Sequence, residues 1–72
     1  MVHTPVTGYR ELSAEEIALI NECKATAIEV GKLCDRVRLT KGIDQRWAAT
    51  GITDLQKGFM SLIRSIAQPT TF

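Results

Sequence analysis

The sequence predicts an all-α protein in which two antiparallel helices form a hairpin behind a short N-terminal arm. Residues 14–40 and 45–67 carry apolar side chains three and four positions apart, the spacing that places them on one helix face. Helix-capping residues precede both stretches. A chain of 72 residues also buries too little surface to fold without disulfides, a metal or partner subunits. We therefore expect one domain, residues 1–72, assembled into a compact homo-oligomer.

The predicted arm, residues 1–12, contains a proline and Gly8 and has no helical period. Ser13 and Glu16 follow it and match the capping box, in which the two residues satisfy each other's free backbone N–H groups. We therefore expect the first helix to begin at residue 14 and to end near residue 40. Gly42 then supplies the left-handed backbone that commonly terminates a helix.

The second helix, residues 45–67, has equally local boundary signals. Asp44 is a favoured N-cap residue. Pro69 blocks further extension, because a proline lacks the backbone N–H and clashes with the preceding turn. Residues 68–72 form the predicted tail.

Folding the chain at residues 41–43 places two apolar seams against each other. The seams are Ile20, Cys23, Ala27, Val30, Cys34 and Val37 in the first helix, and Ala48, Ile52, Leu55, Phe59, Leu62 and Ile66 in the second. A large side chain faces a small one in most layers, as with Phe59 and Ala27. This complementarity predicts the antiparallel pairing of the helices.

Further apolar side chains lie outside both seams. They are Ile17, Leu19, Ile28 and Leu33 on the first helix, and Trp47, Met60 and Ile63 on the second. Because exposed apolar patches mark interfaces and the first helix is apolar on both flanks, we expect an oligomer larger than a dimer. Gly51 and Gly58 share one face of the second helix, and two interpretations of them stay open. They admit the close approach of another backbone or a ligand, or they serve packing within the hairpin.

Composition argues against several classes of function. Nine basic residues against eight acidic ones give a net charge of +1 without a basic block, so DNA binding is not expected. Cys23 and Cys34 lie about 16 Å apart along one helix, too far for a disulfide. With His3, the single histidine, they form no metal-ligand cluster. Reduced cysteines and the lack of a signal peptide or a long apolar run predict a soluble cytosolic protein that spans no membrane. No catalytic motif is recognisable, so we expect no enzymatic activity, catalytic residue or cofactor.

Two residues have chemistry suited to an anionic nucleotide, although each also has a structural interpretation. Lys24 lies on an apolar flank of the first helix, where a lysine must extend to solvent, pair with an acid or meet an anionic ligand. Tyr9 precedes that helix and either covers the hairpin core or offers a ring on which a base stacks. The hairpin brings Lys24, Arg64, the arm and the tail to one end, a set able to hold a nucleotide.

The stretch YRELSAEEIALINECK from Tyr9 and the run DQRWAATGITDLQKGFMSLIRSIAQPTTF from Asp44 together resemble the phage anti-CBASS sponge family. CBASS is a bacterial immune system in which a cyclase makes cyclic oligonucleotides that activate a killing effector. The resemblance implies a phage-encoded protein in the host cytoplasm that binds this messenger and withholds it without cleaving it. Family members are small helical hairpins that form homohexamers, so a hexamer is implied as well.

The resemblance also implies a binding site. The family's base-stacking tyrosine matches Tyr9, and its phosphate-binding lysine matches Lys24. A threonine two positions further matches Thr26, and an arginine of the second helix matches Arg64. The glycine before the tyrosine matches Gly8 and lines a second family site for cyclic trinucleotides. The implied ligands are cyclic dinucleotides such as cGAMP and, at the second site, cyclic trinucleotides.

An alternative function belongs to a different class. A small helical hairpin that oligomerises through its apolar flanks is also suited to a structural role or to binding a protein partner. Binding measurements with cyclic nucleotides distinguish the two hypotheses.

Overall fold

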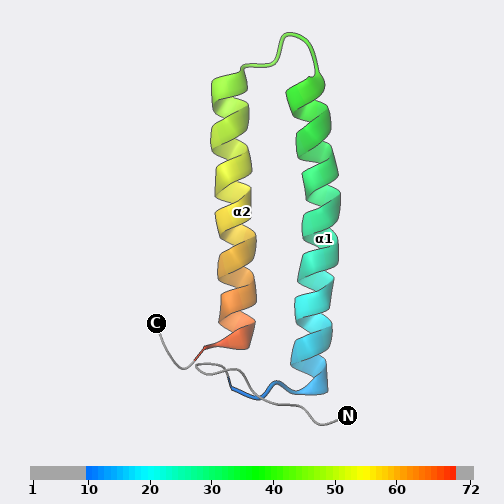
Figure 1. Ribbon diagram of the computed structural model, residues 1–72, viewed down its shortest axis with the longest axis vertical. Coiled ribbons are helices and arrows are strands. Elements are labelled where there is room, and N and C mark those ends of the chain that lie inside the picture. The colour runs from blue at the N-terminus through cyan, green and yellow to red at the C-terminus, as the bar shows by residue number, and fades with distance from the viewer. Residues whose placement is uncertain (1–9, 70–72) are drawn as a thin grey trace.

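Two long helices lie side by side and antiparallel in the computed structural model, which describes residues 10–69 (Figure 1). Helix α1 spans Ala14–Leu39 and helix α2 spans Gln45–Ala67. The described residues include no strand. The predicted all-helical hairpin is therefore confirmed, with α1 ending one residue earlier than expected.

Local side-chain chemistry starts α1 as the sequence predicts. The Glu16 backbone N–H donates to Ser13 Oγ at 3.1 Å, and the Ser13 N–H donates to Glu16 Oε1 at 2.9 Å. This is the complete capping box, which satisfies two N–H groups that the first turn of a helix otherwise leaves unpaired.

The turn between the helices also follows its sequence signals. Thr40 caps α1 through an N–H···O bond to Val37 of 3.2 Å. Gly42 has φ 89°, in the left-handed region that favours glycine. Asp44 Oδ1 then accepts from the N–H groups of Arg46 and Trp47 at 3.0 and 3.1 Å, which starts α2.

Helix α2 ends in a left-handed residue that is not a glycine. Gln68 has φ 44°, and its N–H donates to the Arg64 carbonyl at 2.8 Å. Its side-chain amide donates to the Ser65 carbonyl at 3.1 Å, so one residue satisfies two carbonyls of the last turn. Pro69 follows it, where the sequence predicts that the helix stops.

The seam of α1 is placed as predicted. Its half-buried apolar residues are Ile20, Cys23, Ala27, Val30 and Cys34, while Val37 is at the margin of exposure. Both cysteines are free thiols.

The predicted seam of α2 is wrong at two positions. Ala48, Ile52, Phe59 and Ile66 are half-buried, but Leu55 and Leu62 are 44% and 53% exposed, and Ile63 is half-buried instead. Ile63 lies four residues beyond Phe59, about 40° past a full turn, whereas Leu62 lies three residues beyond it, about 60° short. The face that α2 turns toward α1 is therefore rotated toward Ile63.

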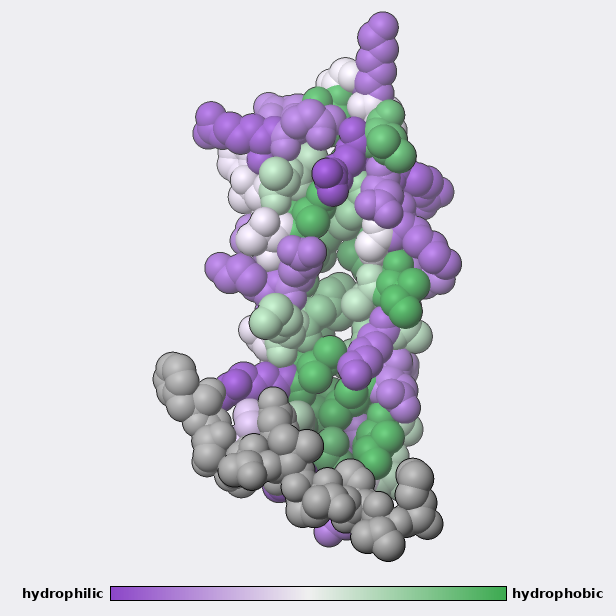
Figure 2. All heavy atoms as spheres, viewed as in Figure 1, coloured by the Kyte–Doolittle hydropathy of each residue, from purple (hydrophilic) through white to green (hydrophobic). Residues whose placement is uncertain are grey.

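The hairpin has no fully buried residue among those described, and much of its apolar surface faces solvent. Figure 2 shows apolar side chains at the surface along one face of the molecule, with polar groups at its margins. Ile28, Trp47 and Met60 are 61%, 67% and 70% exposed. The hairpin therefore leaves large apolar side chains uncovered, and such exposed apolar surface marks an interface.

Candidate functional site

Lys24 projects from the half of α1 nearer the chain termini, and its side chain is exposed. Its ammonium group makes no hydrogen bond or ion pair with any residue that the structure describes. The flank around it is apolar, with Ile17 and Ile28 one turn or two away and Gly31 beyond. An unpaired cation on an apolar flank is suited to an anionic ligand, and of the three sequence interpretations the structure removes pairing with a described acid.

Thr26 does not lie beside Lys24 within one chain. Residues two apart on a helix are separated by about 200°, so the two side chains point to opposite flanks of α1. The Thr26 hydroxyl donates to the Glu22 carbonyl one turn back at 2.9 Å, which leaves its oxygen lone pairs as acceptors. A single hairpin therefore cannot present both side chains to one small ligand.

Arg64 lies in the last turn of α2, in the same half of the hairpin as Lys24, and its side chain is exposed. It borders a shallow hollow of about 310 Å³ with Lys57, Met60 and Ser61. Two cations and one serine hydroxyl surround this hollow, which is chemistry suited to a phosphate. Within one chain the hollow lies on the outer side of α2, away from the seam with α1.

Tyr9 and Gly8, the other two predicted site residues, lie outside the described residues. The first described residue, Arg10, makes an interaction that the sequence analysis did not identify. Its guanidinium forms a bidentate ion pair with Glu16 and also donates to the Ile66 carbonyl at 2.7 Å. No periodic pattern could have revealed it, because the partners are six and 56 positions away.

The Arg10–Glu16 pair changes the electrostatics at this end of the hairpin. The Arg10 side chain first, and then the Ser13 backbone N–H, lower the pKa of Glu16 from 4.5 to about 2. The hydrogen bond between the two side chains also raises the pKa of Arg10 above its ordinary value. Both groups therefore remain charged across the physiological range.

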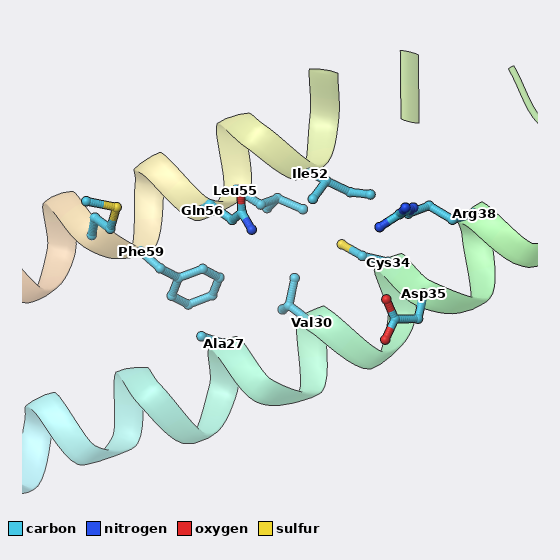
Figure 3. Close-up of a pocket in the computed structure, with 11 residues that line it drawn as sticks. Ala27, Val30, Cys34, Asp35, Arg38, Ile52, Leu55, Gln56 and Phe59 are labelled. Atoms are coloured by element: carbon cyan, nitrogen blue, oxygen red, sulfur yellow. The ribbon is translucent and has the colours of Figure 1, made fainter. Parts of the chain in front are cut away.

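A second recess runs along the groove between the helices (Figure 3). Its volume is about 500 Å³, and apolar side chains from both helices line it, with Phe59 reaching toward Ala27. Asp35, Arg38 and Gln56 provide its polar groups. No cluster of His, Cys, Asp or Glu side chains able to hold a metal occurs in residues 10–69. Neither helix is long and apolar enough to cross a membrane.

Comparison with known proteins adds to this geometry. Residues 1–67 match the family described as Acb2/Tad1, hairpin domain. The chain is also similar to anti-CBASS protein 2 of Pseudomonas phage JBD67, with 29% identity over 101 aligned positions that cover 93% of this chain and 94% of the relative. Because the alignment is longer than the 72-residue chain, the relative contains residues with no counterpart here.

Proposed function

Since the chain belongs to the Acb2/Tad1 hairpin domain family, we propose that it is a phage anti-CBASS protein that binds cyclic oligonucleotide messengers and withholds them from their effector. The family match over residues 1–67 carries this proposal, because it includes both helices and the arm. The name of the similar phage protein, anti-CBASS protein 2, supports the same activity. The proposed place of action is the cytoplasm of the infected host cell.

The proposed site combines a stacking surface with cations. Tyr9 stacks on a base, and Lys24 binds a phosphodiester of a cyclic dinucleotide such as cGAMP. The exposed ammonium of Lys24, which no described residue neutralises, supports this assignment. Arg64 is proposed as a further phosphate ligand, and Gly8 as part of a second site for cyclic trinucleotides.

Thr26 enters the site only through assembly. Because Thr26 and Lys24 point to opposite flanks of α1, a ligand that touches both must lie between copies of the chain. Lys24 would then come from one copy and Thr26 from another. The ligand site and the oligomer are therefore parts of one proposal.

The proposed oligomer is a hexamer. The number of copies comes from the resemblance to the anti-CBASS sponge family, and the uncovered apolar side chains of the hairpin support association. Apolar side chains on both flanks, such as Ile28 at 61% and Trp47 at 67% exposure, support contacts with more than one neighbour.

Calorimetry of the purified protein tests the function. The panel contains cGAMP, cyclic di-AMP, cyclic di-GMP and a cyclic triadenylate, with linear dinucleotides as controls. We expect at least one cyclic nucleotide to bind tightly and the linear controls to bind far more weakly. Failure of all cyclic nucleotides to bind an assembled protein would refute sequestration.

The exposed apolar flanks favour one second candidate, a helical hairpin that binds a protein partner. Met60 is 70% exposed, and it lies beside Gln56 and the groove rather than within a core. This function predicts no response to the cyclic nucleotide panel. It also predicts that substitution of Met60, and not of Lys24, abolishes binding of the protein partner.

A further inference from the structure

One flank of α2 carries two leucines and two glycines that the hairpin leaves uncovered. Leu55 and Leu62 are 44% and 53% exposed, and Gly51 and Gly58 are exposed as well. At about 100° per residue, these four positions lie within about 60° of one another around the helix axis. The side of α2 that packs against α1 is centred about 80° further round the helix. The four residues therefore form a separate face, which we call the leucine–glycine face.

Large and small side chains alternate along the leucine–glycine face. Its members are four, three and four residues apart, which is the spacing of a coiled-coil seam. Leu55, Gly58 and Leu62 all border an apolar hollow of about 520 Å³. A Cβ atom added to either glycine meets nothing within 4 Å. The face therefore offers both side chains that can insert into a neighbouring helix and open spaces that can receive them.

The order of large and small residues selects the direction and the register of a facing copy. In an antiparallel pair whose facing residue numbers sum to 113, Gly51 lies opposite Leu62 of the second copy. In the same register, Leu55 lies opposite Gly58. Two-fold symmetry repeats both contacts, so every leucine meets a glycine. No other antiparallel register opposes a large residue to a small one at all four positions, and a parallel pair in register sets leucine against leucine and glycine against glycine.

We propose that the leucine–glycine face binds the same face of a second copy, with the two α2 helices antiparallel across a two-fold axis. The occupant is a second copy because the face is complementary to itself. A glycine opposite each leucine lets the backbones approach closely and covers leucines that the hairpin leaves exposed. The next layer pairs Ala48 with Ser65, whose small side chains do not hold the helices apart. The inference goes beyond the proposed function, because it assigns an interface without reference to any nucleotide.

Two double variants of identical composition test this register. Gly51→Leu with Leu62→Gly exchanges a facing pair, so each layer still holds one leucine and one glycine. Gly58→Leu with Leu62→Gly is the mismatched control, because it sets one leucine against Leu55 and one glycine against Gly51. Both variants contain Leu62→Gly, and both add a side chain at a glycine with open space around it. Their effects on the hairpin itself should therefore match.

Light scattering across a range of protein concentrations measures the result, and circular dichroism checks the helix content. The exchange of a facing pair should keep the parent's size. The mismatched variant should associate at least about 25-fold more weakly, since symmetry applies the overpacked layer twice and each layer weakens association about fivefold or more. Equal sizes of the two variants would overturn the pairing, as would a parent that stays a single hairpin. Failure of the pairing in an assembled parent leaves sequestration standing, because calorimetry of the parent tests it separately.

Discussion

Replacement of Gly51 and Gly58 by alanine should affect folding and assembly in opposite directions. The two glycines are seven positions apart on the flank of α2 that carries Leu55 and Leu62. A Cβ atom added at either position meets nothing within 4 Å. Packing within the hairpin therefore does not require glycine at these positions. We predict that the two glycines admit the close approach of another backbone.

The expected magnitudes follow from that empty space. Glycine in a helix interior is about 1 kcal/mol less favourable than alanine, so Gly51→Ala and Gly58→Ala together should stabilise the isolated hairpin by about 2 kcal/mol. If a second backbone contacts these positions, each added methyl group overpacks the interface, at a cost of about 1–3 kcal/mol. Association should then weaken at least fivefold for each contact, although each hairpin becomes a better helix former.

Light scattering and circular dichroism across a range of protein concentrations measure both effects. The double variant should shift toward smaller species at micromolar concentration while its helix content holds. Thr50→Ala is the matched control, because Thr50 is exposed on the outer side of α2 and its hydroxyl bonds only to the Arg46 carbonyl of its own helix, at 3.0 Å. This control should keep the parent's size. A glycine double variant of parental size with a raised Tm would refute the argument.

Three further outcomes are expected for the site and its surroundings. Lys24→Ala should weaken cyclic dinucleotide binding by about 1.5–3 kcal/mol, a loss that shrinks as salt rises, and Tyr9→Ala should weaken it by about 1–3 kcal/mol with little salt dependence. Assembled variants that bind like the parent in calorimetry would place the site elsewhere. The bound messenger should be recovered intact by chromatography after the protein is denatured, whereas linear product formed at enzyme-like rates would contradict sequestration. Because the folded-state pKa of Glu16, about 2, is below its ordinary value of 4.5, the stability that its ion pair with Arg10 supplies is fully present above the ordinary value and is lost as the pH falls toward 2. The Tm difference between the parent and Glu16→Gln should therefore shrink over that interval, and a constant difference would exclude the ion pair as its source.

The parts of the fold that could be predicted from the sequence are those determined by residues close together along the chain. The Ser13–Glu16 capping box, the Asp44 N-cap and the left-handed Gly42 are all determined within a few positions, and each occurs as predicted. The α1 seam could be identified from the unbroken three- and four-residue spacing of its apolar positions and from their match to those of α2, although apolar residues also lie on both flanks of α1. In α2, adjacent Leu62 and Ile63 offer two phases, and only packing against α1 selects Ile63.

Contacts between residues far apart along the chain could not be predicted from the sequence. Arg10 binds partners at distances along the chain that no helical period connects, so its contact with Ile66 depends on the completed hairpin. Lys24 and Thr26 were grouped by resemblance, although helical geometry points them to opposite flanks. That separation is informative, because it makes the proposed site dependent on more than one copy.

Such a dependence links binding to assembly thermodynamically. A ligand held between copies binds the assembled state and not the separated hairpins, so it must stabilise the assembly by mass action. The glycine double variant then becomes a test of the site as well as of the interface. Its Lys24 and Tyr9 are intact, yet its apparent affinity should fall at protein concentrations where it dissociates, and saturating cyclic dinucleotide should restore its size. Unchanged affinity in the dissociated variant would mean that one hairpin contains the whole site, and Thr26 would then have no part in it.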